Sequence, residues 1–247
     1  MGKAYRMVLF DCFNTLFLPD ASRVPTILVE GKPTVSTAGL LKALIAPEDA
    51  ELTPERIHRA HRQAWAWAEG QRGAAHHEVS AQARFRHMLE LLGIAALAED
   101  FVERLLAAHI DAVTESYTLP DAHRALLERL ASARRLALFS NFDYAPGLRR
   151  LLRRTALEGR FDPVVISAEI GYRKPGRAAF ERALALAGEP LERILFVGDS
   201  LDDDVSGAAA VGLDVAWLNP AAGPRAASSP WPTFELRALD EIESLLD

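Results

Sequence analysis

Short apolar runs alternate with amphipathic segments at the start and in the second half of this 247-residue chain. The runs lack the polar alternation of a strand with one solvent-exposed face, so each is typical of a strand buried on both sides. Strands alternating with helices predict an α/β fold, a doubly wound (Rossmann-like) parallel sheet with right-handed crossovers. The runs are residues 7–10, 136–139, 164–166, 194–197 and 215–218, and a last strand near 233–235 and a terminal helix should follow.

Residues 36–117 have a different pattern, because one helical periodicity follows another with no strand pattern between them. Residues 26–29 and 34–36 flank the segment Glu30-Gly31-Lys32-Pro33 and predict a small hairpin near 26–36. We therefore expect a core of residues 1–18 and 118–247 and an inserted all-helical cap of residues 19–117. The predicted cap helices are residues 38–46, 54–70, 79–92 and 97–116.

Polar residues directly follow three of the predicted strands. Asp11 follows the first, Ser140 and Asn141 follow the second, and Asp199 follows the run at 194–197. The carboxyl ends of parallel strands meet at one edge, so these residues should lie close together. That edge would hold a carboxylate able to act as nucleophile, base or metal ligand, and a hydroxyl with backbone N–H groups able to bind an oxyanion.

Two further features point to the same edge. Lys174 lies on a loop before Pro175, from which a cation could offset carboxylate repulsion and contact a phosphoryl group. Four acids crowd into the segment from Asp199 to Asp204, which is costly without a cation and favours a hard ion such as Mg²⁺. The alternative for one of these acids is to cap the helix that starts near Asp203, a role that fits Asp202 or Asp203 better than Asp199.

The ordered motifs resemble the haloacid dehalogenase (HAD) superfamily of hydrolases, in its phosphatase-like branch with a helical cap. The resemblance implies that Asp11 is the nucleophile and a Mg²⁺ ligand. The backbone carbonyl of Phe13 and the carboxylate of Asp199 would be further ligands, and Asp204 would support the metal site. Whether Asp203 or Asp204 plays this part stays open.

The resemblance also assigns the groups that would hold the substrate. Ser140, the backbone of Asn141 and Lys174 would bind the transferred group, and Thr15 would orient the Asp11 carboxylate. The single cysteine, Cys12, is expected to point into the core as a small hydrophobe.

One position departs from the superfamily's phosphatases, which carry an Asp two residues after the nucleophile. That Asp protonates the leaving oxygen and later activates water, and Phe13 can do neither. An aromatic residue there is familiar from the superfamily's dehalogenases, which need no metal and usually lack an acid matching Asp199. In the cap, the loop from Gly73 to Glu78, with two histidines, is a candidate source of a substitute acid.

Phe13 is typical of the dehalogenases, whereas Asp199 is typical of the metal-dependent phosphatases. Three functions are compatible with this combination. The favoured one is a Mg²⁺-dependent phosphatase of a small phosphorylated metabolite, acting through an aspartyl-phosphate on Asp11. The second is a 2-haloacid dehalogenase, for which Arg23 and Lys42 are candidate carboxylate-binding residues. The third is a catalytically weak HAD-like protein that binds a phosphorylated ligand.

Composition restricts the partners and the compartment. The net charge of −6 and the lack of a basic stripe argue against nucleic acid. A single cysteine forbids an intramolecular disulfide, and no apolar run approaches the roughly 18 residues that span a membrane. We expect a cytoplasmic monomer or homodimer.

Overall fold

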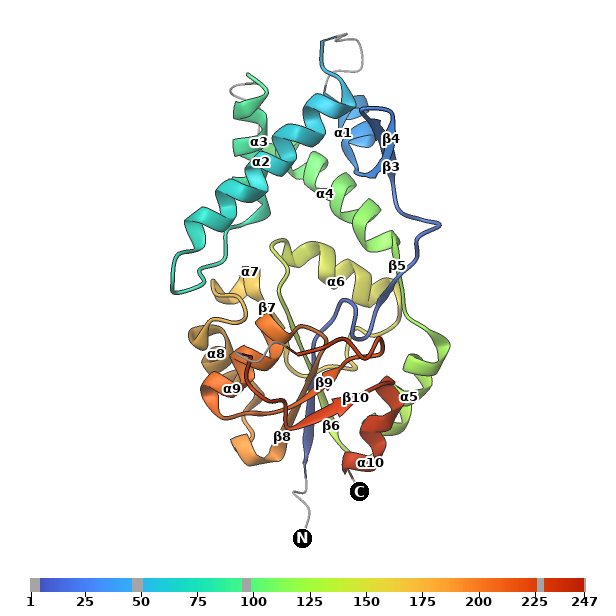
Figure 1. Ribbon diagram of the computed structural model, residues 1–247, viewed down its shortest axis with the longest axis vertical. Helices are drawn as coiled ribbons and strands as arrows, with labels where there is room; N and C mark the ends of the chain where they lie inside the picture. Colours follow the sequence, from blue (N-terminus) through green and yellow to red (C-terminus); the bar gives the residue numbers. More distant parts are fainter. Residues whose placement is uncertain (1–4, 46–50, 95–98, 226–228, 247) are drawn as a thin grey trace.

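The computed structural model describes residues 5–45, 51–94, 99–225 and 229–246, which form a lower α/β core and an upper helical cap (Figure 1). Residue 46 of the first predicted cap helix and residues 97–98 of the last lie outside the described residues. No helix in these ranges is long and apolar enough to cross a membrane.

A six-stranded sheet forms the core, and every strand pair in it is parallel. Its order is β10-β9-β8-β1-β6-β7, in which β1 lies between β6 and β8, as the doubly wound prediction requires. The strands are β1 (Met7–Phe10), β6 (Arg135–Ser140), β7 (Val164–Ile166), β8 (Ile194–Gly198), β9 (Asp214–Leu218) and β10 (Phe234–Leu236).

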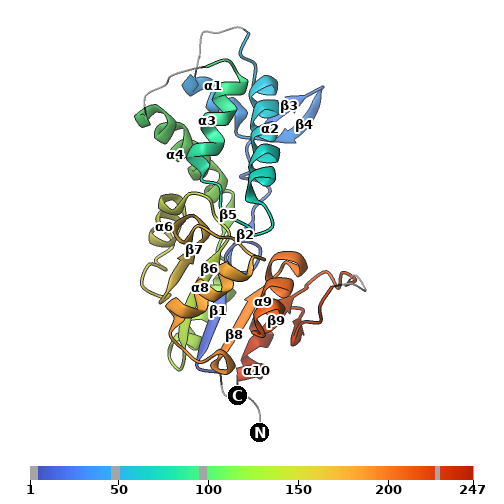
Figure 2. The same cartoon turned by 90° about the vertical axis from the view of Figure 1, so that its left-hand side faces the viewer.

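Alternate side chains of these strands pack on opposite faces of the sheet, which explains the unbroken apolar runs. Val8 and Phe10 join one buried cluster, while Met7 and Leu9 join the other. Figures 1 and 2 show helices on both sides of the sheet. The core helices are α5 (Asp121–Ala131), α6 (Ala145–Arg154), α7 (Ser167–Ile170), α8 (Arg177–Ala187), α9 (Ser206–Val211) and α10 (Glu243–Leu246).

The cap has its own apolar core, formed by the inward faces of four helices. Thr53 caps the longest of them, and Pro54 occupies its first turn, where the missing N–H costs nothing. The helices are α1 (Ala38–Ile45), α2 (Pro54–Arg72), α3 (Ala81–Leu91) and α4 (Glu99–Glu115), and the predicted hairpin is present as β3 (Thr26–Val29) and β4 (Lys32–Val35).

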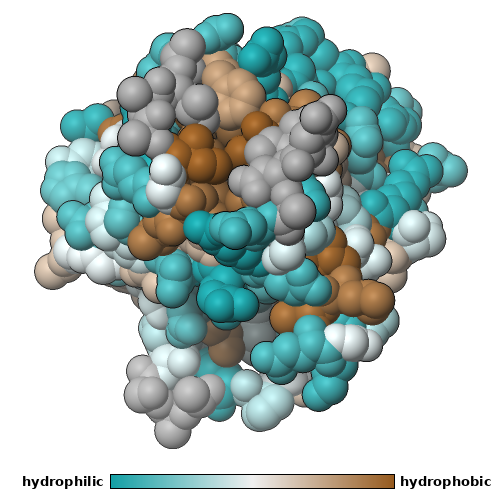
Figure 3. Space-filling model, turned by 90° about the horizontal axis from the view of Figure 1, so that it is seen from above, coloured by the Kyte–Doolittle hydropathy of each residue, from teal (hydrophilic) through white to brown (hydrophobic). Residues whose placement is uncertain are grey.

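The chain passes twice between core and cap through a short antiparallel pair, β2 (Leu18–Pro19) and β5 (Tyr117–Thr118). Seen from above, the cap end carries apolar surface between hydrophilic regions (Figure 3). Exposed apolar side chains of the hairpin and α1 include Leu28, Val35, Leu40 and Leu44.

Candidate active site

The nucleophile candidate Asp11 lies at the end of the sheet that faces the cap, because the chain leaves β1 there to enter the cap. Its backbone N–H donates to the carbonyl of Val197 at 2.8 Å, which continues the β1–β8 pairing. Ser140, the last residue of β6, is buried beside it on the neighbouring strand. As predicted, the ends of β1 and β8 bring Asp11 and Asp199 close together, and Ser140 ends the strand on the other side of β1.

Lys174 is the buried cation of the site. Its Nζ lies 2.6 Å from Oδ1 of Asp11 and 2.6 Å from Oδ1 of Asp204, and donates to the carbonyl of Phe139 at 3.2 Å. Burial alone would lower the lysine pKa, but the two carboxylates outweigh it and raise the pKa above its ordinary value. The ammonium is therefore charged and links two acids that could not otherwise be buried side by side.

Three carboxylates converge into an arrangement suited to a cation. One oxygen each of Asp11, Asp199 and Asp204 lies within 4.8 Å of the others. Asp204 also accepts the Ser200 N–H at 2.9 Å, whereas Asp203 turns away. An all-oxygen donor set fits a hard divalent cation such as Mg²⁺.

The turn after β8 orients these acids. A Cβ on Gly198 would lie 2.3 Å from Oδ2 of Asp204, so only glycine lets the carboxylate pack against the strand end. Ser200 caps the helical turn Leu201–Val205 by accepting the Asp203 N–H at 3.0 Å. The expectation that Asp202 or Asp203 provides the cap is therefore wrong, because the serine hydroxyl already occupies that position.

Burial shifts the protonation of this cluster. It raises the pKa of Asp11 to about 7, with Lys174 opposing and Asp204 adding to the shift. It raises the pKa of Asp199 to about 6, where Asp204 again adds and Lys174 opposes. Without a cation the site therefore holds protons near neutral pH, and a cation would favour the ionised carboxylates.

Asn141 has a role that its sequence position did not indicate. Its side-chain oxygen accepts the Lys174 N–H at 2.8 Å, and its amide nitrogen donates to the Lys174 carbonyl at 3.0 Å and to Asp203 at 3.1 Å. The asparagine side chain thus clamps the backbone of the lysine loop, in addition to the backbone role expected of it. Residue spacing carries no signal for this contact.

Thr15 and Cys12 complete the loop after β1. The Thr15 hydroxyl donates to Oδ1 of Asp199 at 3.4 Å, instead of to Asp11 as expected. Cys12 is fully buried in the core cluster, as predicted, and burial raises the pKa of its thiol well above the ordinary value.

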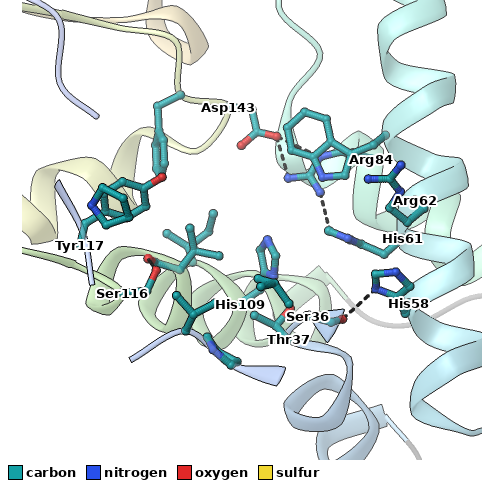
Figure 4. A pocket seen from close by; sticks show the side chains of 18 of the residues that line it. Ser36, Thr37, His58, His61, Arg62, Arg84, His109, Ser116, Tyr117 and Asp143 are labelled. Atoms are coloured by element: carbon teal, nitrogen blue, oxygen red, sulfur yellow. Dashed lines mark hydrogen bonds and ion pairs between the residues drawn. The ribbon is translucent and has the colours of Figure 1, made fainter. Parts of the chain in front are cut away.

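Phe13 packs into an aromatic cluster between the nucleophile loop and a cavity. Its ring lies 4.8 Å from the Tyr117 ring, edge to face, and stacks on Phe142 at 5.3 Å. Tyr117 and Phe142 in turn line a cavity of about 540 Å³ between cap and core (Figure 4). The position of the missing acid is thus filled by an apolar wall.

The cap loop from Gly73 to Glu78 contacts the lysine loop. Glu78 N–H donates to the Gly171 carbonyl at 3.0 Å, and Arg173 N–H donates to the His76 carbonyl at 2.9 Å. The Glu78 carboxylate is 2% exposed and lies 3.3 Å from the Arg173 guanidinium. The loop therefore packs against the lysine loop with Glu78 already paired, and a role of its two histidines as proton donors stays a prediction.

The match to a family model decides the family. Residues 5–212 match the model described as haloacid dehalogenase-like hydrolase. The chain belongs to this family. Among its relatives, the pyrimidine 5′-nucleotidase YjjG of Escherichia coli is 32% identical over 73% of this chain and 77% of its own length. The N-acylneuraminate-9-phosphatase of Rattus norvegicus is 30% identical over 52% of each chain.

Solved structures of HAD-like proteins share the fold. The putative HAD-hydrolase YfnB of Bacillus subtilis, solved with magnesium, aligns at a TM-score of 0.64 with 23% identity over 99% of this chain and all of its own. A 2-haloacid dehalogenase from Pseudomonas syringae pv. Tomato aligns at 0.71 with 21% identity over 98% of both chains. At these identities the likeness concerns the fold alone.

Proposed function

We propose that this HAD-like hydrolase is a Mg²⁺-dependent phosphatase of a small phosphorylated metabolite, acting through an aspartyl-phosphate on Asp11. The convergence of Asp11, Asp199 and Asp204 beside Lys174 carries the proposal, since it suits a cation and an anionic substrate together. The phosphatase and nucleotidase among the relatives support the same reaction class.

The Mg²⁺ ligands would be Asp11, Asp199 and the backbone carbonyl of Phe13, with Asp204 supporting the site. When bound, the ion neutralises charge on carboxylate and phosphate, so that the two anions can approach. Thr15 positions Asp199 through its hydroxyl. The oxygen-only donor set and the raised carboxylate pKa values are both consistent with a cation at this position.

The chain's own residues carry out the remaining steps. A carboxylate oxygen of Asp11 attacks phosphorus while the bond from phosphorus to the substrate alcohol breaks. Lys174, the Ser140 hydroxyl and the Asn141 backbone N–H bind the phosphoryl oxygens and stabilise the charge that develops on them. Water then attacks phosphorus, releasing inorganic phosphate and restoring the carboxylate.

Phe13 limits this chemistry, because it cannot protonate the departing alkoxide. General acid–base help contributes roughly 10²–10⁴-fold in rate. The leaving oxygen must therefore take its proton from solvent or from the substrate itself. We expect modest turnover on simple alkyl phosphates and faster turnover where the leaving group is a weaker base.

The experiment is inorganic phosphate release from a panel of phosphate monoesters, with Mg²⁺ and with chelator. Asp11→Asn should lower turnover by about a thousandfold or more, as loss of a nucleophile does. Asp202→Asn is the matched control, because this exposed acid in the same segment is outside the carboxylate cluster. Full turnover by the Asp11 variant would rule out the mechanism.

Phe13 favours one second candidate, a metal-independent 2-haloacid dehalogenase in which a halide leaves without protonation. The substrate carboxylate would need a cation in the cap, but Arg23 pairs at the surface with Asp20 at 3.2 Å. Lys42 lies on α1, outside the cavity lining. Halide release that survives chelation and requires Asp11 would establish this function, and its absence with short haloacids would exclude it.

A further inference from the structure

Helix α2 carries a buried stripe of side chains and a second stripe along a cavity, in which Arg62 is exposed to solvent. Its apolar stripe, which includes Ile57, Ala60, Ala64 and Ala68, is buried. A second stripe at i, i+3, i+4 and i+7 lines the cavity, and its members are His58, His61, Arg62 and Trp65. Figure 4 shows the first three pointing from α2 toward the space opposite Tyr117. Packing needs only the apolar stripe, so the polar stripe calls for another explanation.

The polar stripe is rich in hydrogen-bond donors. A guanidinium can only donate, so Nε2 of His61 accepts from Arg84 at 2.9 Å, which leaves its proton on Nδ1. Burial lowers the pKa of His61 well below its ordinary value, so the ring is neutral. Nδ1 of His58 lies 3.0 Å from the Ser36 hydroxyl. Among the described residues, the Arg62 guanidinium has neither a hydrogen bond nor an ion pair.

The charges around the cavity favour an electron-rich ligand. Its described lining contains three arginines and one carboxylate, Asp143. Oδ2 of Asp143 accepts from Arg84 at 2.7 and 2.9 Å, and Arg173 is paired with Glu78. Arg62 is therefore the uncompensated charge in this lining. An amine would be repelled there, and oxygen acceptors or an anion would be attracted.

The opposite side of the cavity contains two aromatic rings. Tyr117 and Phe142 both pack against Phe13, two residues from the nucleophile candidate. A ligand whose phosphoryl group is at Asp11 would therefore pass the aromatic wall first and reach the donors of α2 with its far end. A volume of about 540 Å³ is within the range of small-molecule sites.

We propose that His58, His61 and Arg62 form a donor subsite for the end of the leaving group furthest from the phosphoryl group. The substrate is then a phosphate monoester whose alcohol carries a flat ring with oxygen acceptors, either neutral carbonyls or a carboxylate. This inference rests on the proposed phosphatase function and specifies its substrate class.

Three phosphate monoesters that share a ribose 5-phosphate group test the substrate class. Ribose 5-phosphate has no ring base, uridine 5′-monophosphate adds a ring with neutral carbonyls, and orotidine 5′-monophosphate adds a carboxylate to that ring. At least one ring-bearing ester should exceed ribose 5-phosphate about tenfold or more in kcat/KM, because stacking and hydrogen bonds add binding energy. Whichever of the two ring-bearing esters has the higher kcat/KM shows whether the subsite prefers neutral carbonyls or a carboxylate. Equal kcat/KM for all three would overturn the proposal.

Arg62→Gln tests the subsite itself. It should lower the ratio of kcat/KM for the preferred ring ester to that for ribose 5-phosphate about tenfold, chiefly through KM. Arg59→Gln is the matched control, because this exposed arginine of the same helix lies outside the cavity lining and should leave the ratio unchanged. An unchanged ratio in folded Arg62→Gln would refute the subsite.

Binding separates this inference from the phosphatase proposal. In an Asp11→Asn background with Mg²⁺, calorimetry should give tighter binding of the ring ester than of ribose 5-phosphate, and Arg62→Gln should remove about tenfold of that affinity. Phosphate release without ring preference would contradict the subsite and leave the phosphatase intact. Neither release nor binding of any of the three esters would contradict both.

Discussion

At the scale of single residues, Phe13 places an aromatic ring where a proton donor would assist phosphate-ester hydrolysis. The ring packs against Tyr117 and Phe142, so it supports the cavity wall as well as belonging to the nucleophile loop. Removing it would therefore change both the chemistry and the packing, and a test must separate the two.

Phe13→Asp should raise the turnover of alkyl phosphates by about 10–100-fold, because a carboxylic acid at this position can protonate the leaving oxygen. Phe13→Asn is the matched control, since it removes the ring and supplies no acid. The measurement is kcat for both variants at saturating substrate. Equal kcat for the two folded variants would mean that the proton already comes from elsewhere.

Residue types and strand ends were enough to predict that Asp11 and Asp199 meet, and that Ser140 ends a neighbouring strand. The partner of each polar atom was less predictable. The Asn141 clamp on Lys174 depends on the path of a loop that no local pattern determines. The Thr15 hydrogen bond goes to Asp199 because β8 neighbours β1, and the sequence does not give that strand order.

At the scale of elements, the turn after β8 brings together the acids that could hold a metal ion. Gly198→Ala should move the Asp204 carboxylate, because the new Cβ would lie 2.3 Å from its Oδ2. We expect Mg²⁺ affinity, measured by calorimetry, to fall about tenfold or more as the acids separate.

Gly70→Ala is the matched control, because nothing lies within 4 Å of a Cβ there in helix α2. It should keep Mg²⁺ affinity and stabilise the fold by up to about 1 kcal/mol. Wild-type Mg²⁺ affinity in the Gly198 variant would show that the close approach does not matter.

The regular elements follow largely from periodicity, and the predicted hairpin and cap helices lie within a few residues of the observed ones. The two-residue strands β2 and β5 were not predicted, because so short a pairing leaves no periodic signal. We propose that this pair marks the boundary between the core and the cap, near residues 18–19 and 117–118.

At the scale of the whole molecule, buried polar contacts join cap and core. Arg84 of α3 is 1% exposed and pairs with Asp143, which follows the Ser140-Asn141 turn. Tyr144 donates to Glu103 of α4 at 2.8 Å. The cavity lining comes from segments far apart in the chain, so its composition could not be predicted from any single motif.

Metal and pH should act together on stability. Burial raises the pKa of Asp11 to about 7 and that of Asp199 to about 6. Between about pH 4 and 7 the metal-free folded protein therefore holds more protons than the unfolded chain, and its free energy of unfolding falls as pH rises. Mg²⁺ competes with these protons, so its stabilising effect should be larger at pH 8 than at pH 6.

Thermal unfolding with and without Mg²⁺ at the two pH values measures this effect. At one hundred times its Kd the ion should add about 2.7 kcal/mol, which corresponds to a rise in Tm of about 5–10 °C at pH 8. Asp199→Asn should remove most of the rise. A shift that is equal at both pH values, or that persists in this variant, would exclude binding at the carboxylate cluster.

The central claim is that Asp11 becomes phosphorylated during turnover. The most direct measurement is acid quenching of the protein during turnover of its best phosphate ester with Mg²⁺, followed by mass spectrometry of the peptide that contains Asp11. The account predicts one added phosphoryl group on Asp11, which is absent with chelator and in Asp11→Asn. Sustained phosphate release by an Asp11→Asn variant, with no phosphoryl group on this peptide in the wild-type protein, would contradict it.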